Sequence, residues 1–232
     1  MFETPYQEFI YKRTYARWLP DLNRREKWNE TLTRFEKFMI QSVPEEHHLE
    51  FTQAVDSIYH LNVMPSMRAL WTAGPALDRE NLAGYNCSAI VFDNPRRFSE
   101  LLYLLMCGCG VGFSVERQFV NDLPEIPDLF AYDYVPVIVK DSKRGWAEGL
   151  NKIISMLYVG KMPMWDLSRV RPAGAPLKTF GGRASGPGPL HQLFTQVVHI
   201  FRGAAGRKLS SLEVHDIACH IANAVIVGGV DA

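Results

Sequence analysis

A strand–helix–strand pattern at residues 85–116, YNCSAIVFDNPRRFSELLYLLMCGCGVGFSVE, constrains the fold of this chain more than any other feature. The apolar run at 87–92 is typical of a buried strand, and the apolar segment 98–106 is typical of a helix. A glycine-rich turn at 108–112 and a second β-like run at 113–115 follow. Because a helix joins the two runs, the pattern predicts a βαβ unit with two parallel strands.

Cys87, at the start of the first predicted strand, is the leading candidate for a functional side chain. A cysteine in a strand is usually just a small buried hydrophobic residue. Here the polar Asn86 precedes it, and Gly108, Gly110 and Gly112 in the following unit would let the backbone approach a ligand closely. We therefore predict that Cys87 is a thiol beside a glycine-lined cleft.

The other three cysteines have simpler interpretations. Cys107 and Cys109 flank a glycine and are too close for a relaxed disulfide, so we expect them to pack at a tight turn. Cys219 has His215 four residues before it on the same predicted helical face, and His220 follows it. These three could bind a metal, but zinc prefers four ligands, and packing of a core helix is the favoured interpretation. We predict no metal site.

Composition excludes several classes of function. Lys plus Arg and Asp plus Glu number 25 each, so the formal charge is zero and nothing favours a nucleic-acid partner. No apolar run reaches the roughly 18 residues of a membrane span, and the start has no secretory pattern. Four irregularly spaced cysteines do not form a disulfide framework, which favours a cytoplasmic location.

The first 60 residues are predicted to be helical, at 6–19, 24–39 and 50–61. The second segment carries a dense basic pattern, Arg24-Arg25-Glu26-Lys27-Trp28 together with Arg34. A basic binding patch is one interpretation of this pattern. We favour a solvated helix face on which Glu26, Glu30 and Glu36 pair with the cations.

The middle of the chain alternates turns with short elements. Residues 62–84 contain Pro65, Gly74 and Pro75 and are predicted to be extended chain and turns. Residues 119–134 are predicted to be a loop, with short strands at 135–139 and 167–170. A helix is predicted at 143–159, with Ser142 as its N-cap.

Residues 171–190, RPAGAPLKTFGGRASGPGPL, hold five glycines and four prolines and cannot form a regular element. A flexible linker is one interpretation. Linkers of this length seldom carry Lys178, Phe180 and Arg183 among glycines, so a loop that contacts an anionic ligand is favoured. Helices are predicted at 191–202 and from a Ser210 capping box to about Val227.

With these motifs assembled, the sequence resembles the monomeric, adenosylcobalamin-dependent (class II) ribonucleotide reductases. The resemblance covers most of the chain, and the glycine-proline block is its most specific part. The motifs that carry it are TYARWL, RREKWNET, MPSMRALWTAG, YNCSAI, GVGFSVE, KDSKRGWAEGL, VRPAGAPLKTFGGRASGPGPL and LEVHDIACHIANAVIVGGV.

The resemblance implies roles for individual residues. Cys87 matches the first of two cysteines that form a disulfide as the substrate ribose is reduced. Ser66 and Asn86 lie where the family contacts substrate. Gly110 and Gly112 lie in the turn against which the nucleotide packs.

A second set of positions matches the family's effector region. Residues 171–185 correspond to a loop that senses a deoxynucleotide effector and adjusts which base is accepted. The block 141–146 belongs to the same region, with Asp141, Ser142, Lys143 and Trp146 as its polar and aromatic members. The candidate specificity-loop residues are Arg171, Lys178, Phe180, Gly181, Gly182, Arg183 and Ser185.

The implied fold class is α/β. An N-terminal helical region over 1–61 would precede the first parallel half of a reductase-type barrel over 62–232. The implied activity is reduction of the 2′-hydroxyl of a ribonucleoside triphosphate to make deoxyribonucleotides, with a thiyl radical generated by adenosylcobalamin. The implied partners are a ribonucleotide substrate, a deoxynucleotide effector and thioredoxin or a similar dithiol reductant.

The sequence lacks several parts of the family's pattern, including the second reducing cysteine, much of the cobalamin and phosphate site and the C-terminal relay cysteines. It has no Asn-Pro-Cys-x-Glu segment, which carries the family's radical cysteine and carboxylate. We therefore expect an N-terminal half that needs a C-terminal reductase fragment for activity and for completion of the cobalamin site. A non-catalytic nucleotide-binding remnant is the alternative, and a fragment of a glycyl-radical enzyme is a third hypothesis, which the GGRASGPGP block disfavours.

Overall fold

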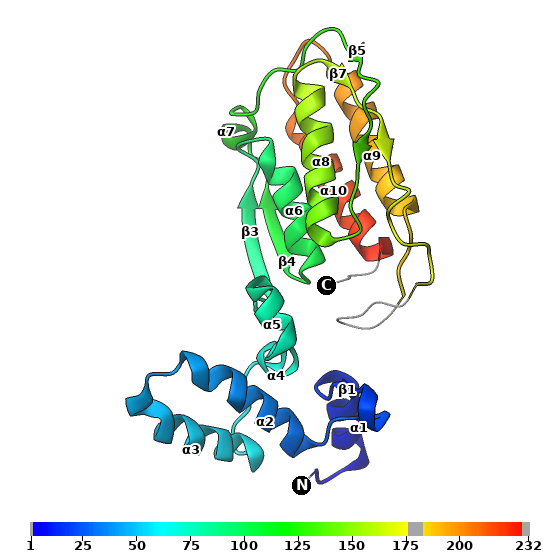
Figure 1. The fold of residues 1–232 in the computed structure, drawn as a ribbon. Helices are drawn as coiled ribbons and strands as arrows, with labels where there is room; N and C mark the ends of the chain where they lie inside the picture. The colour runs from blue at the N-terminus through cyan, green and yellow to red at the C-terminus, as the bar shows by residue number, and fades with distance from the viewer. Residues whose placement is uncertain (1, 176–182, 229–232) are drawn as a thin grey trace. The chain divides into compact units, whose positions relative to one another are not determined.

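The computed structural model describes residues 2–175 and 183–228, with the side chains of 226–228 left out (Figure 1). The chain divides into two compact units, Met1–Asn86 (unit 1) and Cys87–Ala232 (unit 2). The sequence alone placed the division after residue 61. Each unit has its own buried cluster and is described separately below.

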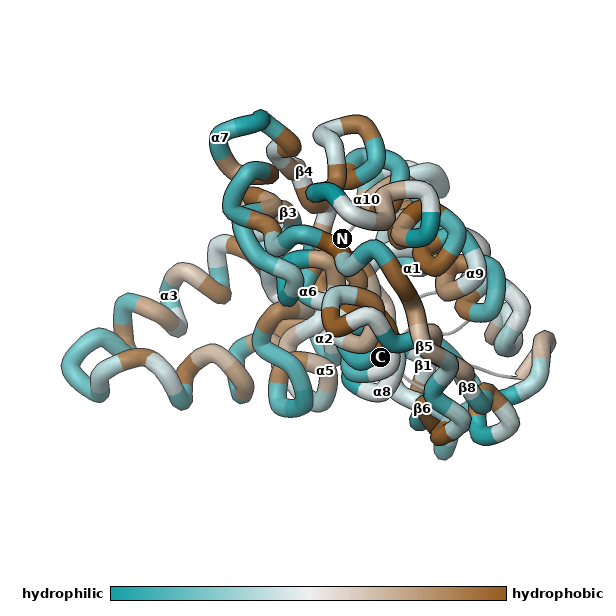
Figure 2. Tube along the Cα trace, turned by 90° about the horizontal axis from the view of Figure 1, so that it is seen from above, coloured by the Kyte–Doolittle hydropathy of each residue, from teal (hydrophilic) through white to brown (hydrophobic). Residues whose placement is uncertain are grey.

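Unit 1 is mainly helical, with one small antiparallel pair of strands. Among its described residues, one short 3-10 turn joins the two strands, and three others lie next to helices. Hydrophilic and hydrophobic positions alternate along α3, as expected of a helix with one buried face (Figure 2). In chain order, its helices and strands are α1 (Pro5–Thr14), β1 (Trp18–Leu19), β2 (Arg24–Arg25), α2 (Trp28–Met39), α3 (His48–Tyr59), α4 (Met67–Thr72) and α5 (Pro75–Arg79).

The three predicted N-terminal helices are present, but two of them are shorter than predicted. Helix α1 begins at a capping box, in which Thr4 Oγ1 accepts from the Gln7 backbone N–H and the Gln7 side chain accepts from the Thr4 N–H. It ends at Thr14 because the next residues form the β1–β2 pair. For the same reason α2 begins at Trp28, not at residue 24.

The basic cluster before α2 is not a solvated face throughout, which corrects the prediction. Arg24 does pair with Glu30 at part-exposed positions, at 2.7 Å. Glu26, however, is buried, and both of its carboxylate oxygens accept from the Arg34 guanidinium, at 2.7 and 2.9 Å. Burial would raise the pKa of Glu26, but hydrogen bonds from Arg34 and from the Arg17 backbone N–H hold it below its ordinary value.

Residues 62–84 are also more helical than predicted. Ser66 is the N-cap of α4, and its Oγ accepts from the Ala69 N–H at 3.4 Å. Pro75 stands in the first turn of α5, where its missing N–H breaks no helical hydrogen bond. Both residues therefore begin helices in a segment predicted to be extended.

Unit 2 combines helices with three parallel strand pairs, β3–β4, β5–β7 and β6–β8. The predicted βαβ unit is confirmed as β3, α6 and β4 (Figure 1). In chain order, the helices and strands of unit 2 are β3 (Cys87–Val91), α6 (Arg96–Met106), β4 (Gly110–Ser114), α7 (Arg117–Val120), β5 (Ala131–Tyr132), β6 (Val137–Ile138), α8 (Lys143–Tyr158), β7 (Lys161–Met162), β8 (Trp165–Asp166), α9 (Gly188–Gly203) and α10 (Ser211–Gly228).

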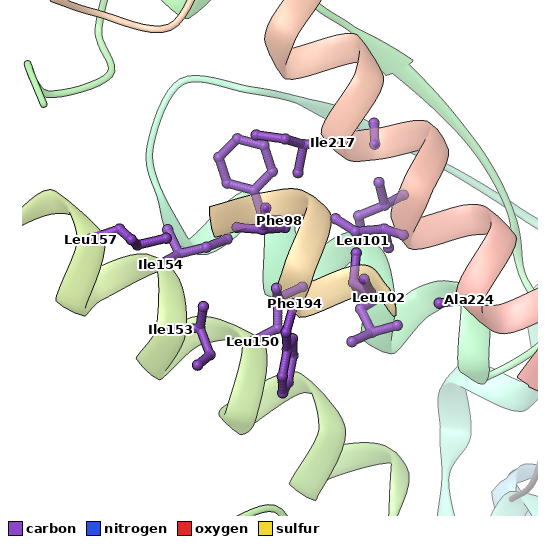
Figure 3. Close-up of a cluster of buried hydrophobic side chains, with 14 of the residues drawn as sticks. Phe98, Leu101, Leu102, Leu150, Ile153, Ile154, Leu157, Phe194, Ile217 and Ala224 are labelled. Carbon is purple, nitrogen blue, oxygen red and sulfur yellow. The ribbon is translucent and has the colours of Figure 1, made fainter. Parts of the chain in front are cut away.

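The core of unit 2 is an apolar cluster between α6, α8, α9 and α10. Figure 3 shows Leu102, Leu150 and Phe194 meeting inside it, and all three side chains are fully buried. The predicted helix caps are confirmed: Ser142 Oγ accepts from the Gly145 N–H, and Ser210 and Glu213 form a capping box. Strong 3.6-residue periodicity and a clear start signal made these helices visible in the sequence.

Several details of unit 2 differ from the predictions. The segment 119–134, predicted to be a loop, contains strand β5, which pairs with β7. Gly110 and Gly112 lie in strand β4, so the turn before it is only two to three residues long and centres on Gly108, with φ of 80°. Residues 167–170 are not a strand, and the strand predicted at 135–139 is reduced to β6. Short parallel strands with two residues each carry too little periodic signal to be located from sequence.

The alternation of helices with parallel strand pairs confirms the predicted α/β class. The described strands form two-stranded pairs and do not close into a barrel. Within the described part of the chain, no helix has the length and apolarity required to span a membrane.

Candidate functional site

Cys87 is the first residue of β3, and its thiol is exposed. In the parallel pairing it lies opposite Gly110 of β4, and Ala89 lies opposite Gly112. Side chains two residues apart point to the same face of a sheet, so these four positions form one face. This surface, the small-residue face, carries nothing larger than a thiol at its four central positions.

The two faces of the β3–β4 pair differ sharply. Ile90 is buried, and it is paired with Phe113, which packs against the core of unit 2. On the opposite side Cys87, Ala89, Gly110 and Gly112 are all exposed. A Cβ added to Gly112 would meet no atom within 4 Å, so the face is open there. The sheet is therefore anchored on one side and accessible on the other.

A hollow of about 460 Å³ lies next to this face and is lined by Ala89, Gly112 and Arg97, among other residues. The Arg97 guanidinium donates to Asp93 and Glu100, each at 2.8 Å. These two carboxylates raise the pKa of Arg97, and Arg97 in turn lowers that of Asp93. Arg97 is thus held by carboxylates. The spacing of Asp93 and Arg97, four residues apart, was the sequence signal that could have revealed this pair.

Ser66 and Asn86, the other predicted substrate contacts, belong to unit 1. The Ser66 hydroxyl caps α4, so it has a structural partner within its own unit. Asn86 is exposed and adjoins Cys87 through the chain. Within unit 2 the structure brings Cys87 together with both predicted glycines, Gly110 and Gly112.

Part of the predicted specificity loop lies outside the described residues. The candidate residues in that part are Lys178, Phe180, Gly181 and Gly182. At one end of the loop, Arg171 Nε donates to Asp141 Oδ2 at 2.8 Å.

At the other end, Arg183 donates to the Gly174 carbonyl at 2.9 Å, and the Gly174 N–H donates to the Ala184 carbonyl at 2.7 Å. Ser185 follows, half-buried, with its Oγ donating to the Gly186 carbonyl at 3.3 Å. The two ends of the loop are therefore close together.

The contact between Arg171 and Asp141 joins two blocks that are 30 residues apart. Both blocks were assigned from sequence to the effector region. Ser142, next to Asp141, is the N-cap of α8, and Trp146 is buried in the first turns of that helix. Lys143 Nζ lies 3.6 Å from the Cys107 sulfur, a contact that the sequence gave no reason to expect.

The remaining cysteines occupy two kinds of site. Cys107 and Cys109 are buried around the turn at Gly108, as predicted. Cys219 was predicted to pack in a core helix, but it is exposed on α10, with its sulfur 3.7 Å from the nearer ring nitrogen of His215. Among the described residues, no group of three or more His, Cys, Asp or Glu side chains is arranged to bind a metal.

Two family models match the chain. The model "Ribonucleotide reductase alpha domain" matches residues 2–75. The model "B12-dependent ribonucleotide reductase, insertion domain" matches residues 117–201. The first match lies in unit 1 and the second in unit 2.

Curated relatives agree with these models. The adenosylcobalamin-dependent ribonucleoside-triphosphate reductase of Lactobacillus gasseri is 28% identical over 291 aligned positions, covering 95% of this chain and 39% of the relative. The enzyme of the same name from Lactobacillus leichmannii is 29% identical, with the same coverage. A protein of Mycobacterium phage D29, provisionally given that name, is 31% identical and covers 97% of this chain and 38% of the relative.

One solved structure, a crystal structure of a B12-dependent (class II) ribonucleotide reductase, superposes with a TM-score of 0.83 at 27% identity. The match covers 94% of this chain and 40% of that one. The chain therefore spans about two fifths of the length of the relatives that it matches. Sequence, family models and fold agree that this chain belongs to the B12-dependent (class II) ribonucleotide reductases.

Proposed function

We propose that this chain is part of a ribonucleoside-triphosphate reductase, in which it supplies one of the two thiols that reduce the ribose. The observation that carries the proposal is the register of β3 and β4, which pairs the exposed Cys87 with Gly110 on the small-residue face. A sugar can approach a thiol closely only where no larger side chain intervenes, and glycine provides that space.

The reaction requires two electrons and two protons per ribose. Replacing the 2′-hydroxyl by hydrogen releases water, while two thiols lose their hydrogens and join as a disulfide. Cys87 supplies one sulfur of that disulfide. The second thiol, the radical-bearing cysteine and a proton-transferring carboxylate come from the remainder of the reductase.

Adenosylcobalamin, after which the relatives are named, supplies the radical when it is bound. The hollows of unit 2 near the small-residue face and near β6 have volumes of about 460 and 470 Å³. A corrin ring with its adenosyl group and nucleotide tail is larger than either hollow. Neither hollow can therefore hold the group by itself, and we propose that the remainder of the reductase completes its binding site.

We further propose that residues 171–185 adjust base preference in response to a deoxynucleotide. The ion pair between Arg171 and Asp141 supports this, because it links the loop to the N-terminus of α8. A ligand that competes for either charge would shift the loop relative to that helix. Arg183 donates one N–H to the Gly174 carbonyl, and its other N–H groups can contact a phosphate, so such a ligand would bridge to the backbone of the loop.

The experiment mixes this chain with a polypeptide that carries the rest of the reductase, together with adenosylcobalamin, a ribonucleoside triphosphate and a dithiol. Deoxynucleotide should form with the wild type and with Cys219→Ser, and should be lost in Cys87→Ser. Cys219 is the matched control because it is also an exposed thiol of unit 2. Equal activity in both variants would contradict the proposed role, and nucleotide binding without turnover in the wild type would favour a non-catalytic module.

The loop is tested with Arg183→Ala in the same assembly. The ratio of products from the four substrates, measured with and without a deoxynucleotide effector, should change in the variant. A uniform fall for all four substrates, with the effector response intact, would show that the loop does not set specificity.

A further inference from the structure

Unit 1 contains a cavity that neither the reductase chemistry nor the predicted specificity loop uses. It has a volume of about 560 Å³ and lies where α1, β2 and the start of α2 meet. Ligand pockets in proteins commonly measure about 300–1,000 Å³, so a small molecule fits. All of its lining residues belong to unit 1.

The cavity has an aromatic wall made of Phe2, Tyr11 and Trp28, whose ring centroids are 5.1 to 5.9 Å apart. Tyr11 and Trp28 are buried, and their polar atoms already have partners: the Tyr11 hydroxyl donates to the Glu26 carbonyl, and the Trp28 N–H donates to the Tyr59 carbonyl. Phe2 is only half-buried. Phe2 stacks on Tyr11 and is the least buried of the three rings, so the part of Phe2 that Tyr11 does not cover is the aromatic surface on which a ligand could stack.

The charges around the cavity do not balance. Its lining contains four cations, Lys12, Arg24, Arg25 and Lys27, but only two carboxylates, Glu8 and Glu26.

Ion pairs account for some of these charges. Lys12 pairs with Glu8, Arg24 pairs with Glu30 and Glu26 is held by Arg34.

Arg25 and Lys27 are the two cations left over. Arg25 donates to a neutral group, the Ala16 carbonyl, at 2.8 Å. Neither residue takes part in the ion pairs found among the described residues, and both are exposed. The cavity therefore carries a formal excess of two positive charges next to an aromatic surface.

We propose that this cavity binds a nucleotide. Its phosphates lie between Arg25 and Lys27, where charge-assisted hydrogen bonds are strong, and its base stacks on Phe2. The surrounding ion pairs hold Arg24 and Lys12 in place and leave Arg25 and Lys27 to contact the ligand. The site shares no residue with the small-residue face or with the loop at 171–185, so it is distinct from both the proposed substrate site and the proposed effector site.

The test is isothermal titration of the whole chain with ATP, with adenosine and inorganic tripolyphosphate as separate arms. Arg25→Gln/Lys27→Gln should weaken one ATP site by about tenfold or more, since two charge-assisted contacts are lost. The control Arg13→Gln/Lys37→Gln removes the same charge from exposed positions of unit 1 outside the cavity lining and should leave that site unchanged. Arg171→Gln/Arg183→Gln should also leave it unchanged, which separates it from the specificity loop.

Lys27→Gln alone serves if the double variant fails to fold, because the Lys27 side chain is exposed. Adenosine and tripolyphosphate should each bind about tenfold or more weakly than ATP, since each lacks one half of the recognition. No saturable ATP binding, or equal loss in the cavity variant and its control, would overturn the proposal. Tripolyphosphate that binds as tightly as ATP would overturn the assignment of a nucleotide.

Discussion

The two units of this chain have cores of different chemistry. Among the described residues, the buried polar side chains Glu26, Thr31 and Thr72 all lie in unit 1. The buried cluster of unit 2 consists of apolar residues throughout. Unit 1 therefore depends on each buried polar group having its partner, whereas unit 2 depends on volume and shape.

The difference is clearest at the centre of each unit. In unit 1, the Arg34 side chain contacts the Glu26 carboxylate and also donates to the Leu70 and Ala73 carbonyls, at 2.9 and 2.8 Å. In unit 2, Leu150 and Phe194 occupy the equivalent central place and contact other hydrocarbon side chains (Figure 3). A substitution at the centre of unit 1 should therefore lower stability by leaving a buried charge without its partner. One at the centre of unit 2 should lower stability by leaving a cavity.

The largest expected effect is that of Arg34→Met in unit 1. It leaves the Glu26 carboxylate buried without its cation, which costs about 3–5 kcal/mol. Hydrogen–deuterium exchange should show loss of protection in α2. Adding Glu26→Gln should recover part of the loss, because the buried charge is removed.

Arg24→Met is the control for that experiment. Arg24 and its partner Glu30 retain 36% and 32% of their side-chain exposure, so water screens the pair and the same substitution there should cost far less than Arg34→Met. Equal losses at the two arginines, or no recovery in the double variant, would contradict an ion-pair core.

The next effect is that of Leu150→Ala in unit 2. Leu150 is fully buried between helices, and the cavity left by its truncation should cost about 3 kcal/mol in the free energy of unfolding, measured by urea denaturation. Leu129→Ala removes the same atoms from a side chain that is 84% exposed, and it should change stability by less than about 0.5 kcal/mol. Similar losses for both leucines would mean that this cluster is not a packed core.

The smallest effect concerns pH and the capping box of α10 in unit 2. The hydrogen bond from Arg207 lowers the pKa of Glu213 from 4.5 to about 2. Because the folded-state value is below the unfolded one, the stabilisation is complete above about pH 4.5 and is lost as the pH falls toward 2. The stability difference between wild type and Glu213→Gln should therefore shrink across that interval. A difference that stays constant with pH would show that the carboxylate charge plays no part.

The contrast between the units also explains what the sequence could reveal. Helix α8 was predicted almost to the residue, because apolar periodicity and a serine N-cap agree there. Glu26 was predicted as a partner for the nearby cations, but the burial of its pair with Arg34 was missed, since nothing in a charged sequence distinguishes a buried ion pair from an exposed one. Ser66 and Pro75 were assigned to extended chain although both begin helices, because prolines and glycines mark turns and helix starts alike.

The candidate site was predictable in part for a similar reason. A βαβ pattern implies neighbouring parallel strands, so the proximity of Cys87 to the glycine-rich segment followed from the sequence. The register that pairs Cys87 with Gly110 could not be predicted from the sequence, because it depends on how α6 packs across the two strands. The contact between Asp141 and Arg171 is a tertiary contact of the same kind.

The most direct test of the account follows the Cys87 thiol through a single turnover. The chain, completed by the rest of the reductase and adenosylcobalamin, is given a ribonucleotide without any dithiol and is then treated with an alkylating reagent. About one deoxynucleotide should form per chain. Mass spectrometry should find Cys87 protected from alkylation in proportion to that product, whereas Cys219 should be alkylated. Product formation with Cys87 still fully open to alkylation would contradict the account.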